Sequence, residues 1–329
     1  TNFGPDGSGK DYIPQNYSGK FTGLVSMRQA LSRSLNIPAI KALYLAGIPQ
    51  TIALAEKLGI TTLTRKNDYG LSLAIGGGEV TLLDEVGAFS VFANDGVRNP
   101  AYAIQKITKA DGSVIVAHES DARRVIGEET ARKIDSILSD NASRTAVFGP
   151  RSPLFVPGFT VAAKTGTTQD FKDAWTVGFT RSIAVGVWAG NNDGTLMRPG
   201  SDGVFVAAPI WRSFMDTVLA VRPDEPFPAY LPVSSETPML TGKLNQRLEY
   251  FNNKSGKKLS EEKMKKTDPE KISQRLVAGE VHDILFYVNK DNPLGLAGPN
   301  RADPMLARWE RGVNGALNPE EEKKKDEKK

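Results

Sequence analysis

The first sixty residues alternate apolar and polar positions with the spacing of short helices. A serine and a glutamine three positions apart form a capping box, which predicts a helix over 26–34. A proline suited to a first helical turn and a closing glycine predict a second helix over 38–47, and a third is predicted over 50–58. Ser34 and Asn36 therefore lie at a junction between two helices, where short side chains can face a cleft.

The middle of the chain predicts a longer helix, a hairpin and a further helix. A triple-glycine turn precedes a helix over 81–96, which a threonine caps and a glycine ends. The apolar segments 104–107 and 114–116 flank an Asp-Gly turn and predict a hairpin, and residues 128–138 have helical spacing. The triple glycine is followed by neither Lys-Ser nor Lys-Thr, so it is interpreted as a packing turn and not as a phosphate loop.

Residues 161–168 form an apolar and β-branched run that predicts a buried strand carrying a cation. Because an unpaired ammonium is costly in a low dielectric, Lys164 is expected to open onto a site that uses its charge. Gly166 lets the strand edge approach a ligand closely, and Thr165 and Thr167 add hydroxyl and backbone N–H groups. This strand is expected to hold an anion and a carbonyl.

Two further strands and a helix follow this run. Residues 174–179 and 183–189 are joined by three turn residues and predict a hairpin. Residues 209–219 predict a helix, and three apolar residues are expected along one side of it: Ile210, Phe214 and Val218. The order of elements indicates an antiparallel sheet between helical layers.

Composition narrows the classes of protein that the chain can belong to. The 329 residues, 40% of them hydrophobic, can bury one sizeable core and a smaller appendage. The chain has no cysteine, which fits an extracytoplasmic protein, and its two histidines, His118 and His282, are too far apart in sequence to suggest a metal cluster. A net charge of +4, interspersed with acids, does not indicate nucleic-acid binding. No metal or cofactor is expected.

The last third of the chain differs in composition from the rest. Residues 1–221 are predicted to form the main domain, and 222–315 a linker with a small appendage. The linker is placed at the proline-rich segment 223–228, and 281–288 supply an apolar patch for the appendage. Residues 316–329 are predicted to be a disordered charged tail.

The Lys-Thr-Gly motif at Lys164, preceded in order by Ser34-x-Asn36, resembles the pattern of penicillin-recognising serine acyltransferases. The flanking segments strengthen the resemblance over roughly the first two thirds of the chain. These segments are Asn16–Phe21, Leu73–Thr81, Phe92–Gly96 and Val187–Asn191. Together they are similar to the transpeptidase domain of high-molecular-weight penicillin-binding proteins, and the flanks to the class A, bifunctional peptidoglycan synthase type.

The chain departs from this family at the nucleophile. The family attacks its substrate with the serine of a Ser-x-x-Lys motif upstream of Ser-x-Asn, yet the serines at Ser8 and Ser18 precede a lysine one position too early. A match at 255–258 follows Lys-Thr-Gly in a lysine-rich segment and is interpreted as chance. The expectation is a truncated or cleaved chain, with the nucleophile and the family's N-terminal membrane anchor on a missing upstream piece.

The resemblance implies a role for each matching residue. Ser34 would pass a proton toward the leaving amine, and Asn36 would orient the motif lysine and the substrate amide. Lys164 would keep this relay polarised and attract the substrate carboxylate. Thr165 and Thr167 would hold that carboxylate, and the Thr167 N–H would form half of the oxyanion hole.

The fold implied by the resemblance is α+β, of the β-lactamase and D,D-peptidase-like type, and N-terminally incomplete. The implied activity is D,D-transpeptidation, which cross-links peptidoglycan stem peptides by serine acyl transfer from D-Ala-D-Ala, with this chain alone inactive. The implied partners are stem peptides, lipid-linked precursor, β-lactams and other cell-wall proteins, at the extracytoplasmic face of a bacterial membrane. Two alternatives stay open: a non-catalytic cell-wall binding or scaffold protein of the same fold, and a D,D-carboxypeptidase or β-lactamase.

Overall fold

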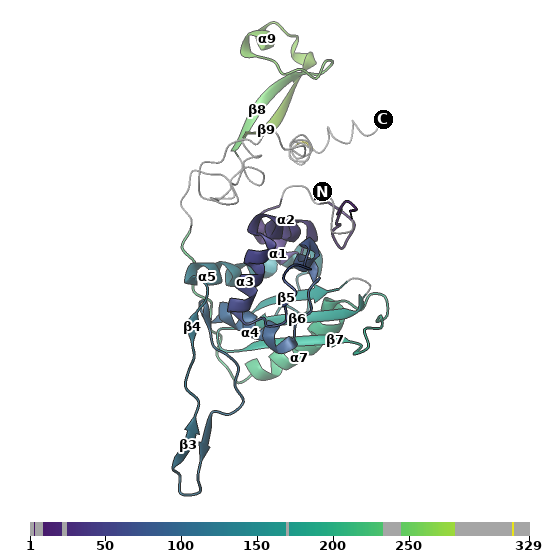
Figure 1. The fold of residues 1–329 in the computed structure, drawn as a ribbon. Helices are drawn as coiled ribbons and strands as arrows, with labels where there is room; N and C mark the ends of the chain where they lie inside the picture. The colour runs from purple at the N-terminus through teal and green to yellow at the C-terminus, as the bar shows by residue number, and fades with distance from the viewer. Residues whose placement is uncertain are drawn as a thin grey trace. The chain divides into compact units, whose positions relative to one another are not determined.

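The computed structural model describes residues 3, 9–21, 25–168, 171–232, 245–279 and 318. The chain divides into two compact units (Figure 1). The first comprises Thr1–Lys20 and Met27–Leu231, and the second comprises Phe21–Ser26 and Pro232–Lys329.

Three helices begin the first unit: α1 (Met27–Ser32), α2 (Asn36–Ala46) and α3 (Ile48–Leu58). They confirm the three helices predicted from spacing, although α2 begins before its proline. Gly47 ends α2 with a φ of +87°, and Gly59 ends α3 in the left-handed region with a φ of +112°. Glycine adopts these conformations without a steric penalty, which explains why both helices stop there.

A 3-10 helix, η1 (Leu71–Ile75), and α4 (Leu82–Ala93) come next and confirm the predicted glycine turn and capped helix. A Cβ at Gly78 would lie only 2.7 Å from a leucine side chain of η1, so the turn lets the backbone pack closely. The hydroxyl of Thr81 caps α4 by accepting a hydrogen bond from the backbone N–H of Asp84 at 3.1 Å.

Replacing Thr81 with alanine is expected to lower the free energy of unfolding by about 1 kcal/mol, because one N–H at the start of α4 loses its acceptor. Urea denaturation of the two chains measures this difference. The matched control is Thr64→Ala, in an exposed loop position, where a change within about 0.5 kcal/mol is expected. Equal losses in the two variants would contradict a capping role for Thr81.

A long hairpin extends from the helices of the first unit (Figure 1). Its outer part pairs β2 (Lys106–Thr108) with β3 (Val114–Ala117), and its base pairs β1 (Val97–Arg98) with β4 (Arg123–Arg124). Gly112 in its turn has a φ of +86°. The hairpin predicted around the Asp-Gly dipeptide is therefore confirmed.

Two helices lead from this hairpin to the sheet. The predicted helix over 128–138 is confirmed as α5 (Glu128–Leu138). The helix α6 (Asn141–Phe148) was not predicted. Asp140 caps α6, since its carboxylate accepts from the Ser143 N–H at 2.9 Å and from the Ser143 hydroxyl at 2.6 Å.

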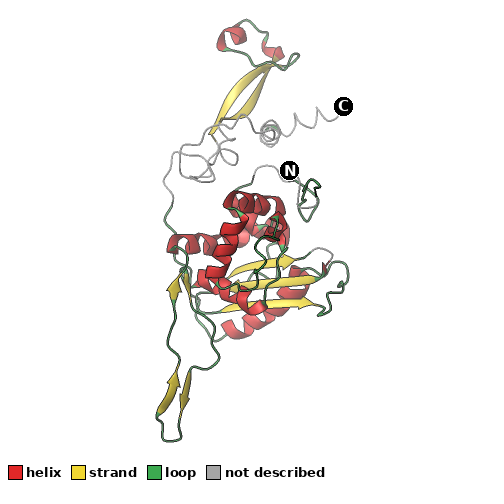
Figure 2. Cartoon of the chain, in the orientation of Figure 1, coloured by secondary structure: helices red, strands yellow, loops and turns green. Residues whose placement is uncertain are grey.

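The central sheet has three antiparallel strands in the order β5 (Ala162–Thr167), β6 (Asp173–Phe179) and β7 (Ala184–Gly190). All three confirm the strands predicted from the sequence (Figure 2). Lys164 lies opposite Val177 in the register of β5 with β6. Since β5 is the outer strand, its other edge is not paired within this sheet.

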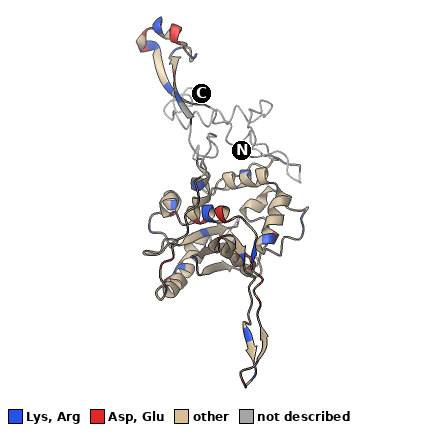
Figure 3. Cartoon of the chain, turned by 90° about the vertical axis from the view of Figure 1, so that its left-hand side faces the viewer, with Lys and Arg blue, Asp and Glu red and all other residues tan. Residues whose placement is uncertain are grey.

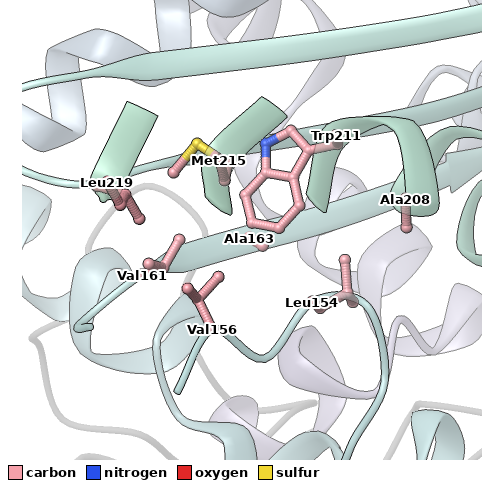
Figure 4. Packing of buried hydrophobic residues seen from close by; sticks show 8 residues of the cluster. All are labelled: Leu154, Val156, Val161, Ala163, Ala208, Trp211, Met215 and Leu219. Carbon is pink, nitrogen blue, oxygen red and sulfur yellow. The ribbon is translucent and has the colours of Figure 1, made fainter. Parts of the chain in front are cut away.

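Helices cover both faces of the sheet. On one face, α7 (Ala208–Leu219) packs its Trp211 and Met215 against Ala163 of β5 (Figure 4). On the other face, Ala162 and Phe179 pack with apolar residues of α4 and α5. Successive residues of a strand point to opposite faces, so Ala162 and Ala163 belong to different core layers. This arrangement confirms the predicted α+β architecture.

The helix predicted over 209–219 is confirmed as α7, and the side that carries Ile210, Phe214 and Val218 is not its buried side. The structure buries a different stripe, made of Ala208, Trp211, Met215 and Leu219. Ile210 and Phe214 are instead 55% and 50% exposed. Both stripes have helical spacing, so periodicity alone did not distinguish them. Contact with the sheet selected the side that carries the tryptophan.

The segment predicted as a linker, 223–228, contacts the first unit. Asp224 accepts hydrogen bonds from the backbone N–H and the hydroxyl of Thr160, at 2.6 and 3.1 Å. The rings of Phe227 and Phe179 meet edge to face, with centroids 5.6 Å apart. The first unit accordingly runs to Leu231, past the predicted boundary at 221.

The second unit contains a hairpin of β8 (Asn245–Asn252) and β9 (Ile272–Gly279). Between these strands lie the short helices α9 (Glu261–Lys265) and η4 (Pro269–Lys271). Figure 3 shows both signs of charge on this module. The apolar patch predicted over 281–288 lies outside the described residues, as does the predicted charged tail apart from one residue, so both stay predictions.

Candidate functional site

The structure brings Ser34 and Lys164 together, although 130 positions separate them in the sequence. The ammonium of Lys164 donates to the Ser34 hydroxyl oxygen at 2.6 Å. The same nitrogen donates to the backbone carbonyl of Thr165 at 2.6 Å. These two acceptors hold the lysine head group between β5 and the junction of α1 with α2. The expectation that the site uses the charge of Lys164 stays a prediction.

Ser34 has a backbone conformation that is uncommon for a residue other than glycine. It lies between the end of α1 and the start of α2, with a φ of +56°. Its N–H donates to the carbonyl of Leu31 at 3.1 Å, which continues the turn at the end of α1. Sterically costly conformations of this kind cluster at functional sites, because the surrounding structure must hold them in place.

Asn36 is not joined to Lys164 by its hydrogen bonds in the described part of the chain. Its side-chain nitrogen donates to the carbonyl of Gln15 at 3.0 Å, and the neighbouring Ile37 N–H donates to the side chain of Asn16 at 3.3 Å. These bonds tie the preceding segment to the first turn of α2. The predicted role of Asn36, orienting a motif lysine and the substrate amide, stays a prediction.

The two threonines of the motif lie on the same face of β5, next to η3 (Gly203–Ala207). The Thr167 hydroxyl accepts from the backbone N–H of Gly203 at 3.1 Å, and the Thr176 hydroxyl of β6 donates to the Gly203 carbonyl at 3.1 Å. Thr165 is 9% exposed and Thr167 is half-buried. The more accessible Thr167 already has one partner of its own chain.

Gly203 is a site residue that the sequence analysis missed. A Cβ there would lie 2.6 Å from the carbonyl oxygen of Gly166 and 2.4 Å from that of Trp175. Real Cβ atoms do not approach backbone oxygen so closely, so any side chain would push η3 away from the sheet. One glycine among many gives no sequence signal, because the close approach depends on segments far apart in the chain.

Burial, together with the positive charge of Arg144, lowers the pKa of Lys164 to about 8. Lys164 therefore gains and loses its proton at a pH closer to neutrality than an ordinary lysine does. A Lys164 ammonium can polarise the Ser34 hydroxyl and attract a carboxylate, and its neutral amine can accept a proton.

Arg144 is a second residue that the sequence analysis missed. It lies in α6 with 2% of its surface exposed, and burial lowers its pKa to about 10. One guanidinium nitrogen donates to the carbonyl of Leu138. Arginine on a helix usually faces solvent, so no pattern in the sequence indicates a buried one.

The loop after β5 is held at the rim of the site. Asp173 accepts hydrogen bonds from the indole N–H of Trp188 at 2.9 Å and from the hydroxyl of Thr168 at 2.8 Å. A Cβ at Gly76 would lie 3.5 Å from the Thr168 side chain, which brings the glycine turn before α4 to the same rim.

The formal Ser-x-x-Lys match at 255–258 belongs to the second unit. The N–H and the hydroxyl of Ser255 both donate to the Asn252 side chain, at 3.0 and 3.2 Å, as in a surface turn. A second tetrad with the same spacing, 260–263, begins at the residue before α9. Neither lies in the unit that contains Lys164.

Two further features of the described residues concern metal binding and membrane insertion. Within them, no group of three or more His, Cys, Asp and Glu side chains is placed to hold a metal ion. In the same part of the chain no single helix is long and apolar enough to cross a bilayer, and the pair α2 and α3, which passes jointly by length and composition, is bent by 96°.

Solved structures define the class of this fold. Penicillin-binding protein 1A from Haemophilus influenzae matches with a TM-score of 0.61 at 23% identity, covering 79% of this chain and 43% of that chain. PonA1 from Mycobacterium tuberculosis, in complex with penicillin V, matches with a TM-score of 0.60 at 25% identity, covering 70% of this chain and 65% of that chain. The fold is therefore that of penicillin-binding transpeptidases, as predicted.

Sequence comparison then identifies the family. The family model of the penicillin binding protein transpeptidase domain matches residues 5–216. Penicillin-binding protein 1A of Aquifex aeolicus is 36% identical over 224 residues, which is 67% of this chain and 29% of that protein. Penicillin-binding protein 1A of Neisseria lactamica is 33% identical over 230 residues, again 67% of this chain and 27% of that protein. The chain belongs to the penicillin-binding protein transpeptidase domain family and spans less than a third of the length of these relatives.

Proposed function

We propose that the first unit acts in peptidoglycan synthesis as a D,D-transpeptidase domain, which cross-links stem peptides by serine acyl transfer from D-Ala-D-Ala. One observation carries the proposal: within the region that matches the family, the lysine of Lys-Thr-Gly donates to the serine of Ser-x-Asn at 2.6 Å. A half-buried hydroxyl–ammonium pair of this kind can move a proton to and from a reacting group.

The proposed reaction assigns a step to each residue. A nucleophilic serine attacks the carbonyl between the two D-alanines, and the terminal D-alanine leaves as an amine that takes a proton through Ser34. Lys164 keeps the Ser34 hydroxyl polarised and attracts the substrate carboxylate. Thr165 and Thr167 hold that carboxylate, and the Thr167 N–H stabilises the oxyanion. An amine of a second stem peptide then attacks the acyl-serine, which releases the nucleophile.

The nucleophile for this reaction is not within the printed residues that precede Ser34, since they hold no Ser-x-x-Lys. We therefore propose that it belongs to a longer parent protein of the class A, bifunctional type, anchored at the extracytoplasmic face of a bacterial membrane. The proposed ligands are stem peptides, their lipid-linked precursor and β-lactams, and the M. tuberculosis neighbour with penicillin V supports the last of these.

Intact-mass spectrometry after incubation with penicillin tests this proposal. The 329-residue chain alone is expected to gain no mass, because it lacks the serine that would be acylated. An extended protein that carries the native sequence upstream of Thr1 is expected to gain one penicilloyl group. An adduct on the chain alone, or none on an extended protein containing Ser-x-x-Lys, would contradict the assignment.

The missing nucleophile motif also supports a second candidate, a binding or scaffold protein of the cell wall that keeps the cleft without catalysis. The coding sequence upstream of Thr1 separates the two. A Ser-x-x-Lys in frame within a few tens of residues supports the transpeptidase, and a start codon at or just before Thr1 supports the binding protein.

A further inference from the structure

Residues 15–17, which precede α1, are anchored at the Ser-x-Asn motif. The Gln15 carbonyl accepts from the side chain of Asn36 at 3.0 Å. The Asn16 side chain accepts from the Ile37 N–H at 3.3 Å and donates to the backbone carbonyl four residues later at 2.9 Å. Asn16 is 8% exposed. Since the two ends of a buried amide are both paired, this end of the segment is held firmly on the first turn of α2.

The same segment ends beside the Lys-Thr-Gly motif. The Tyr17 hydroxyl donates to one carboxylate oxygen of Asp202 at 3.4 Å. The other carboxylate oxygen caps η3 by accepting from two backbone N–H groups, each at 3.1 Å, so it holds Asp202 without help from the tyrosine. Asp202 is followed by Gly203, whose N–H donates to the Thr167 hydroxyl at 3.1 Å. Three consecutive residues therefore join α2 to the residue before η3.

These contacts form a closed circuit with the hydrogen bond between Lys164 and Ser34. Asn36 lies two residues after Ser34, Ser34 accepts from Lys164 at 2.6 Å, and β5 continues from Lys164 to Thr167. Tyr17 is 67% exposed, so the segment lies on the solvent side of this circuit. An exposed tyrosine whose hydroxyl and neighbouring backbone are both held offers a rigid aromatic contact at little cost in entropy.

We propose that residues 15–17 are a strap across the entrance to the site and that Tyr17 is a specificity-determining residue, whose bond to Asp202 limits the size of the groups that reach Lys164. This inference rests on the proposed function, in which a stem peptide enters the site. One end of the strap stays anchored through the buried Asn16, whereas a single hydrogen bond at the surface holds the other. A bulky group can therefore enter when that one bond opens.

A tyrosine that only stabilised the fold would behave differently. Its loss would change acylation by small and large substrates alike, because the whole site would be disturbed. A strap that limits size affects only substrates with a bulky group. The ratio between the acylation rates of a large and a small substrate separates these two roles.

Acylation of the extended protein by two penicillins measures this ratio. One is the bare penicillin nucleus, which has no acyl side chain, and the other carries a large fluorescent acyl side chain. Tyr17→Phe keeps the ring and loses the bond to Asp202, so its rate with the large penicillin is expected to rise about 3- to 10-fold, the range that one hydrogen bond allows. Its rate with the bare nucleus is expected to stay unchanged. The matched control is Tyr102→Phe, at a tyrosine of the long hairpin that is 53% exposed, and both rates are expected to stay unchanged in it.

A reversible cross-link tests the strap in the opposite direction. The 329 residues contain no cysteine, so Tyr17→Cys combined with Asp202→Cys introduces two thiols, and any upstream cysteine is replaced by serine. A short bis-methanethiosulfonate joins the thiols, and dithiothreitol releases them. The joined form is expected to lose acylation by the large penicillin, and the released form of the same protein to recover it. The control pair is Glu56→Cys with Lys66→Cys, at a surface ion pair of 2.7 Å, whose joined and released forms are expected to acylate equally.

The outcomes separate this role from the proposed function. If the unsubstituted extended protein forms no adduct with either penicillin, the proposed function fails and the specificity role fails with it. If adducts form but Tyr17→Phe does not raise the rate of the large penicillin relative to the bare nucleus, the specificity role fails alone. If the two cysteines of the 329-residue chain each take up a separate reagent molecule instead of being joined, as intact mass shows, the strap itself is contradicted.

Discussion

Replacing Lys164 with alanine is expected to lower the rate of penicilloyl formation roughly 100- to 10,000-fold, the usual contribution of a group that assists proton transfer. The measurement is made on the extended protein, with its native sequence upstream of Thr1. The loss is expected because Ser34 no longer receives the 2.6 Å hydrogen bond that polarises its hydroxyl. In the proposed reaction, the cation that attracts the substrate carboxylate is also removed.

Lys172 provides the control for this experiment. It is an exposed lysine in the loop that follows the same strand, and Lys172→Ala is expected to acylate at the unsubstituted rate. Lys164→Arg keeps the positive charge but places it on a larger, planar group. Compared with Lys164→Ala, this variant is expected to recover substrate attraction more fully than proton transfer. Acylation by Lys164→Ala within threefold of the unsubstituted rate would remove the lysine from the proposed relay.

Replacing Trp211 with alanine is expected to lower the free energy of unfolding by about 3–5 kcal/mol. The indole is fully buried between α7 and the sheet, where it packs with Met215 and with Ala163 of the Lys-Thr-Gly strand (Figure 4). Its indole N–H has no hydrogen-bond partner in the described part of the chain, so the expected loss comes from packing. Urea denaturation followed by circular dichroism measures it.

Phe214 is the matched aromatic control on the same helix. It is 50% exposed, on a side of α7 away from the buried tryptophan's stripe. Phe214→Ala is therefore expected to cost less than about 1 kcal/mol, because little buried area is lost. A larger loss for Phe214→Ala than for Trp211→Ala would contradict the burial of the tryptophan side of the helix.

Most elements could be predicted because their signals are local. A threonine before an apolar run opens α4, an Asp-Gly turn separates β2 from β3, and a glycine ends α3. Each of these depends on the conformational preference of a few neighbouring residues. The unpredicted α6 has only 8 residues, and the residue that it buries is an arginine and not an apolar side chain.

The site could be predicted only in part, because only some of its residues have a local signal in the sequence. Lysine in an apolar strand and the order of two motifs indicated Ser34 and Lys164, and the structure joins them by a hydrogen bond. Gly203 and Arg144 had no such signal. Gly203 matters through its close approach to backbone oxygens, and Arg144 through its burial in α6, and both arise only after the chain has folded.

Local sequence signals were enough to place most helices and strands of the first unit, and to indicate residue types that could bind an anion and a carbonyl. They were not enough to place α6, to show which side of α7 is buried, or to show how far the first unit extends, all of which depend on contacts in the folded chain. The physical reason is the range of the forces involved. Backbone preferences act over a few neighbouring residues, whereas packing and electrostatic interactions depend on distances between residues far apart in the sequence.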